Sequence, residues 1–101
     1  MYACIDEPSS ESRIDPLCFR VRGWARPPGG FAKGDVVEAW ADGAVIGATA
    51  AVHERPDVTA ALGLPPGTST GFEFFAHHPS TNGAAFELQL RLRRAVFLLR
   101  A

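Results

Sequence analysis

The chain has 101 residues, of which 47% are hydrophobic and 21% charged, and this composition predicts one globular domain with a single core. A net charge of −1 gives no attraction to phosphate backbones or anionic lipid, so we do not expect nucleic acid as a partner. No apolar run approaches the roughly 20 residues that span a bilayer, and residues 1–7 lack signal-peptide features, so we expect a cytoplasmic location.

The first third of the chain predicts two strands. Residues 3–6 are expected to form a short edge strand, followed by a polar loop. In residues 17–24, Leu17, Phe19 and Val21 alternate with polar side chains, which is the period of a half-buried strand. The other face of this strand carries Cys18, Arg20, Arg22 and, at its end, Trp24.

A tight hairpin is the clearest local signal. Residues 36–41 and 44–52 are apolar, strand-like runs separated by Asp42-Gly43. Asp-Gly tolerates the positive φ angles of a two-residue hairpin turn, so this segment is expected to begin an antiparallel sheet. Alanines in the second run favour close packing against a neighbouring segment.

Residues 56–62 predict the one short helix. Pro56 or Asp57 is suited to its start, with Asp57 as the capping side chain, and Gly63 is suited to its end. Val58, Ala61 and Leu62 follow helical spacing, so we expect them to form its apolar stripe.

The last third predicts further strands. Residues 71–77 place Phe72, Phe74 and Ala76 on one face, and residues 86–94 alternate apolar and polar side chains throughout. The two are joined by a loop with an Asn82-Gly83 turn, and a final strand is expected at residues 96–99. About seven short strands without a crossover helix predict an all-β fold, an antiparallel sandwich or a small barrel.

Three motifs occur in a fixed order. They are Gly23-Trp24-Ala25, Val37-Glu38-Ala39-Trp40-Ala41-Asp42-Gly43 followed by Ile46-Gly47, and Arg55-Pro56-Asp57-Val58 with Ala61 and, later, Gly71-Phe72. Together they resemble the immunoglobulin-like β-sandwich accessory domains of bacterial glycosyltransferases and methyltransferases, over roughly residues 17–93. The resemblance implies a non-catalytic module of a longer protein, here the single domain 1–101, that acts in surface-glycan assembly or modification beside a catalytic domain. The chain departs from the pattern at Ala39, where the family has a bulkier residue.

Four residues are candidates for ligand binding. Trp24 and Trp40 fit either burial at the sandwich edge, with the indole N–H bonded to backbone, or stacking on a sugar ring. Arg55 fits a structural pair with a carboxylate or a loop carbonyl, the favoured reading, or contact with a ligand. Asp57, beside it, is the fourth candidate.

The remaining polar residues predict no catalytic site. His53, His77 and His78 are interpreted as ordinary histidines, because no nucleophile motif accompanies them. Cys4 and Cys18 are interpreted as free, buried or half-buried thiols, with a disulfide as the alternative if their strands are neighbours. They lack the close spacing of a zinc site, and no metal or cofactor is expected. The arginines near the C-terminus favour a solvated strand face over a docking surface; they are Arg91, Arg93, Arg94 and Arg100.

Three hypotheses of function follow. The first is a non-catalytic accessory or interaction module whose partner is a catalytic domain of the same chain or another protein. The alternative is a carbohydrate-binding module that uses Trp24, Trp40 or Phe75. A small enzyme that uses His77 or His53 ranks third.

Overall fold

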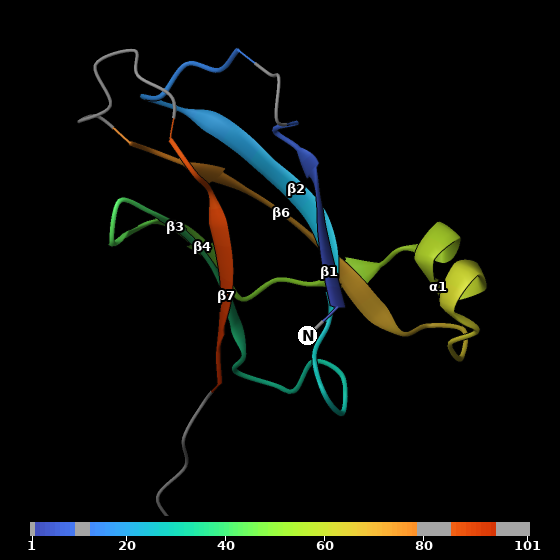
Figure 1. The fold of residues 1–101 in the computed structure, drawn as a ribbon. Coiled ribbons are helices and arrows are strands. Elements are labelled where there is room, and N and C mark those ends of the chain that lie inside the picture. Colours follow the sequence, from blue (N-terminus) through green and yellow to red (C-terminus); the bar gives the residue numbers. More distant parts are fainter. Residues whose placement is uncertain (1, 10–12, 79–85, 95–101) are drawn as a thin grey trace, which may run out of the picture.

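The computed structural model describes residues 2–9, 13–78 and 86–94, which form two antiparallel sheets packed face to face (Figure 1). The first sheet has four strands in the order β1-β2-β6-β5, and the second has three in the order β4-β3-β7. This is the order of an immunoglobulin-like sandwich, in which strands A, B, E and D form one sheet and strands C and F belong to the other. The bounds are β1 Tyr2–Glu7, β2 Phe19–Arg26, β3 Val36–Ala41, β4 Ala44–Thr49, β5 His53–Glu54, β6 Ser69–Ala76 and β7 Gln89–Arg93.

The core lies between the two sheets, where period-two alternation directs apolar side chains inward. Phe72 and Val21 are fully buried, and burial of each side chain contributes about 1.5–3 kcal/mol to folding. β2 and β6, the strands that carry these two residues, also have polar side chains on their outer faces. The four-stranded sheet therefore has one buried face and one solvent-exposed face. The buried cluster consists of Phe19, Val21, Ala25, Val37, Ala39, Phe72, Phe74 and Ala76.

The β3–β4 hairpin forms as the sequence predicts. Asp42 and Gly43 both adopt positive φ, at 50° and 79°, which is the conformation that a two-residue hairpin loop of this kind requires. Val37, Ala39 and Ala41 point into the core from β3, so its outer face carries Val36, Glu38 and Trp40.

The edge of β4 lies against β6 and links the two sheets on that side. The His77 N–H, just beyond β6, donates to the Ile46 carbonyl at 2.8 Å. A Cβ at Gly47 would lie 2.8 Å from the Phe75 carbonyl oxygen, so the approach requires glycine there. The predicted strand 44–52 nevertheless ends at Thr49, and the chain then leaves the three-stranded sheet to add β5 to the other one.

Other sequence predictions need correction at their ends. The strand predicted at residues 17–24 begins at Phe19 and continues to Arg26, so Leu17 lies outside it and is 59% exposed. The strand predicted at 86–94 covers only Gln89–Arg93, although its polar and apolar faces are as expected. The turn at residues 82–83 and the strand at 96–99 lie outside the described residues.

Helix α1, Pro56–Leu62, has the predicted bounds but not the predicted stripe or cap. Gly63 ends it in the left-handed conformation, as expected. Val58 is the one fully buried residue of α1, whereas Ala61 and Leu62 are exposed, because α1 lies outside the sandwich (Figure 1). No side chain caps its N-terminus, so the capping role predicted for Asp57 was wrong. Among the described residues, no helix is long and apolar enough to cross a membrane.

Cys4 and Cys18 are both free, and both are exposed rather than buried or half-buried as predicted. Cys4 lies opposite Trp24 in the β1–β2 register, whereas Cys18 precedes the first residue of β2. The strand length between them separates the two thiols by far more than a disulfide spans.

Candidate functional site

The four predicted site residues lie on two different outer faces of the sandwich. Arg55 lies between β5 and α1, and Asp57 lies in the first turn of α1. Trp24 lies on the outer face of the four-stranded sheet. Trp40 lies on the outer face of the three-stranded sheet. The structure therefore brings three of the four to one surface and leaves the fourth in a separate place.

Arg55 forms the centre of a small ion-pair cluster with Asp6 and Asp57, here called the Arg55 cluster. Its Nε and Nη2 donate to the two Asp57 carboxylate oxygens at 3.0 and 2.7 Å, and its Nη1 donates to Asp6 Oδ2 at 2.8 Å. The Arg55 side chain is 15% exposed, against 36% for Asp6 and 65% for Asp57. The predicted pair between Arg55 and a carboxylate is confirmed, and it is double.

Local sequence explains why Arg55 reaches this position. Pro56 restricts the preceding residue to extended backbone, and Arg55 has φ −114° and ψ 96°. Its stem then crosses Gly71, where a Cβ would lie 2.6 Å from Arg55 Cγ and 2.6 Å from His53 Nε2. Gly71 in turn lies opposite Trp24 in the β2–β6 register. The motif that begins at Arg55 and the glycine of Gly71-Phe72 are thus two halves of one packing arrangement.

The electrostatics of this cluster fix its charge state. The hydrogen bonds that Arg55 donates to the two carboxylates, Asp57 first and Asp6 second, raise the pKa of Arg55 above its usual range. The guanidinium in turn lowers the pKa of Asp57. Arg55 and Asp57 are therefore both charged at neutral pH, and the cluster ties β1 to the start of α1.

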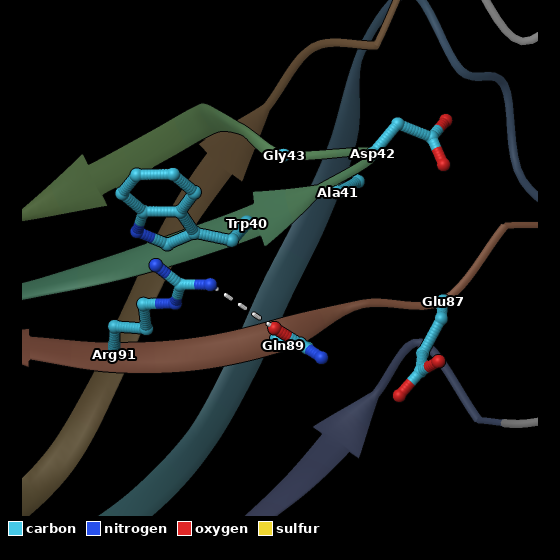
Figure 2. A pocket seen from close by; sticks show the side chains of 7 residues that line it. All are labelled: Trp40, Ala41, Asp42, Gly43, Glu87, Gln89 and Arg91. Atoms are coloured by element: carbon cyan, nitrogen blue, oxygen red, sulfur yellow. Dashed lines mark hydrogen bonds between the residues drawn. The ribbon is translucent and has the colours of Figure 1, made fainter.

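A shallow groove of about 260 Å³ lies on the outer face of the three-stranded sheet, and we call it the Trp40 groove (Figure 2). It begins at the β3–β4 turn and follows β7. Its lining residues are Trp40, Ala41, Asp42, Gly43, Glu87, Gln89 and Arg91.

Trp40 is half-buried, and its indole is held by charged side chains. The Arg91 guanidinium carbon lies 4.0 Å from the ring centroid, over one ring face. The indole N–H donates to Glu38 Oε1 at 3.4 Å, so the backbone partner predicted for it was wrong. Glu38 also accepts from Arg93 Nε at 3.3 Å. Arg91, Arg93 and Arg94 are exposed, as expected for a solvated strand face, and Arg100 lies outside the described residues.

One histidine differs from its sequence interpretation. His78 is 4% exposed, its Nε2 lies 2.8 Å from Asp42 Oδ2, and its ring meets the edge of Phe86 at 4.8 Å between centroids. Position 78 continues the inward parity of Phe72, Phe74 and Ala76 beyond the end of β6, and this signal was available in the sequence. Burial of His78 fixes the Asp42 side chain at the mouth of the Trp40 groove.

The other two histidines are exposed and lie elsewhere. His77 Nδ1 lies 2.6 Å from the Leu17 carbonyl oxygen, and His53 lies on β5 beside Gly71. Within residues 2–9, 13–78 and 86–94, no three histidine, cysteine or acidic side chains gather in a metal-binding arrangement.

The two surfaces differ in what they can do. In the Arg55 cluster the guanidinium is saturated by carboxylates, which suits a structural contact. The Trp40 groove combines an aromatic ring, a cation, an amide and two exposed carboxylates, which suits recognition of a small polar ligand.

Comparison with known protein families, with curated proteins and with solved structures found no match.

Proposed function

We propose that this chain is a non-catalytic accessory module of a bacterial enzyme of surface-glycan assembly or modification, with a glycosyltransferase or methyltransferase as its catalytic neighbour. A cytoplasmic location is part of the proposal. The observation that carries it is the role of the motif residues. Several of those that support the family resemblance, among them Gly47, Arg55 and Gly71, hold the sandwich together.

The second and third motifs contain residues with a structural task. Asp42-Gly43 makes the hairpin turn, and Gly47 admits β6 against β4. Arg55, anchored by Asp57, needs Gly71 beneath it. A sequence pattern whose residues form turns and close packing contacts is typical of a scaffold that supports a neighbouring domain.

Two measurements test this proposal. The coding sequence on either side of these residues should encode a glycosyltransferase or methyltransferase domain in the same reading frame or the adjacent gene; a parent protein of another kind would overturn the context. The purified chain, incubated with nucleotide-sugar or S-adenosylmethionine donors and glycan acceptors, should give no modified product by mass spectrometry. Turnover would overturn the non-catalytic role.

A second function, carbohydrate binding, is favoured by the Trp40 groove. Trp40 lies beside amide and carboxylate groups that suit the hydroxyls of a sugar. Phe75 is 66% exposed and lies opposite Arg20 in the β2–β6 register. Titration of a ¹⁵N-labelled chain with a glycan panel should shift the Trp40 indole signal; unchanged spectra across the panel would remove this function.

A further inference from the structure

We propose that the Trp40 groove recognises a carboxylate-bearing sugar of the hexuronic acid class, with Arg91 as the receptor for its carboxylate. The inference rests on the carbohydrate-binding function proposed above and adds the chemical class of the ligand. Its evidence is the charge pairing of the arginines and the distribution of charge along the groove.

Arg91 differs from the arginines that have a structural task. Arg20, Arg55 and Arg93 each form an ion pair with a carboxylate within 4 Å. Among the described residues Arg91 has no such partner; its contacts are the Trp40 ring and Gln89 Oε1, which accepts from Nη2 at 3.5 Å. Its charge is therefore available to a ligand.

The stacking of Arg91 on Trp40 prepares this charge for recognition. A guanidinium held over an indole ring loses much of its rotational freedom before the ligand arrives, so less is lost on binding. Its planar fork matches the two oxygens of a carboxylate. Because the guanidinium covers one face of the indole, a ligand that approaches that face meets the cation before the aromatic ring.

The far end of the groove has the opposite charge. Figure 2 shows Arg91 and Trp40 at one end, Gln89 between, and the carboxylates of Asp42 and Glu87 toward the other. Carboxylates accept hydrogen bonds from sugar hydroxyls, whereas they repel a ligand that is anionic throughout, such as an inorganic phosphate. A neutral sugar would leave Arg91 without a counter-charge.

Size narrows the ligand to a single unit. A volume of about 260 Å³ lies below the roughly 300–1,000 Å³ of pockets for drug-sized ligands. The groove is also open, so we expect one terminal or internal hexuronic acid to occupy it with weak affinity. Repetition along a polysaccharide then raises the apparent affinity through multivalency.

The test compares sugars that differ only in the acid group. A ¹⁵N-labelled chain is titrated with the methyl glycosides of glucuronic, galacturonic and mannuronic acid, and with those of the matching neutral hexoses. At least one hexuronide should shift the Trp40 indole and Arg91 Nε signals, with affinity about tenfold above that of its neutral partner. Arg91→Gln should abolish that difference, Arg91→Lys should reduce it, and Arg22→Gln, an exposed arginine on the other sheet, should leave it unchanged.

The outcomes separate this inference from the functions proposed before it. Equal binding of acid and neutral sugars overturns the inference and leaves carbohydrate binding in place. Binding of no sugar overturns both, while the accessory role is still decided by the neighbouring coding sequence. Equal shifts with sodium acetate would reduce the groove to a simple anion contact and would also overturn the inference.

Discussion

Arg55 and Arg91 lie on opposite faces of the sandwich and have different roles. Arg55 is 15% exposed and makes three hydrogen bonds to two carboxylates. Arg91 is exposed and stacked on Trp40, with no carboxylate within 4 Å among the described residues. Arg55 has its counter-charges within the chain and has a structural role. Arg91 has no such ion pair among the described residues and is available to a ligand.

The largest effect on stability is expected from Gly71→Ala. Its Cβ would come within 2.6 Å of Arg55 Cγ and His53 Nε2, and the anchored guanidinium keeps Arg55 from moving away freely. Overpacking of this kind costs about 1–3 kcal/mol, so we expect the free energy of unfolding in urea to fall by about 2 kcal/mol.

A double-mutant cycle with Arg55→Ala identifies the cause. If Arg55 is the obstacle, the alanine at position 71 costs less once the arginine side chain is gone, with a coupling of about 1 kcal/mol. Part of the cost remains because His53 also overlies this position. Strictly additive effects of the two substitutions would show that the Arg55 stem does not press on Gly71.

Arg55→Lys ranks second. The substitution keeps the charge and most of the stem but replaces a planar fork that bonds both Asp57 oxygens at once. Loss of one or two partly exposed charge-assisted hydrogen bonds should lower the unfolding free energy by about 1 kcal/mol. The matched Arg91→Lys, on the other face, should change it less; the reverse order would contradict the structural role of Arg55.

The third prediction concerns acid stability. The guanidiniums of Arg55 and Arg20 hold the pKa values of Asp57 and Glu7 below their usual range. A carboxylate with a lowered folded-state pKa stabilises the fold at pH above its unfolded value, near 4, and this contribution disappears as the pH falls through the folded value. Urea unfolding from pH 7 to pH 2.5 should therefore show stability falling below about pH 4.

Asp57→Asn tests that assignment. The variant should be less stable at neutral pH and should lose less stability on acidification, because it lacks one of the carboxylates that must be protonated. Glu87→Gln provides the control, since Glu87 has no ion pair among the described residues. An unchanged pH profile in Asp57→Asn would mean that other carboxylates govern acid unfolding.

How much the sequence revealed also differs between the two surfaces. The β3–β4 turn and α1 are each determined by residues that are close together in the sequence, so both were predicted with the correct bounds. The pair between Arg55 and a carboxylate was predicted as well, but Asp6 was not identified as one of its partners. Asp6 lies on β1, and β1 comes near the segment before α1 only because of the order of the strands in the four-stranded sheet. A contact 49 residues apart has no local signature.

The Trp40 groove could not be predicted because it depends on register. Trp40 lies opposite Gln89, and Arg91 lies opposite Glu38 one step along, which places the guanidinium diagonally over the indole. A shift of one residue would send Gln89 and Arg91 into the core face. Periodicity identified the outward residues of each strand, but not which of them would be neighbours.

Arg91→Gln is expected to have the smallest effect on stability and the largest effect on binding. Arg91→Gln removes a cation–π contact at an exposed site, which is worth about 0.5–1 kcal/mol, and leaves no carboxylate unpaired. We therefore expect its unfolding free energy to stay within about 1 kcal/mol of the unaltered chain, with an unchanged circular dichroism spectrum. Arg55 substitutions should do the opposite and disturb the fold. If Arg91→Gln destabilised the chain as much as Arg55→Lys, Arg91 would be a structural residue, and the contrast between the two faces would disappear.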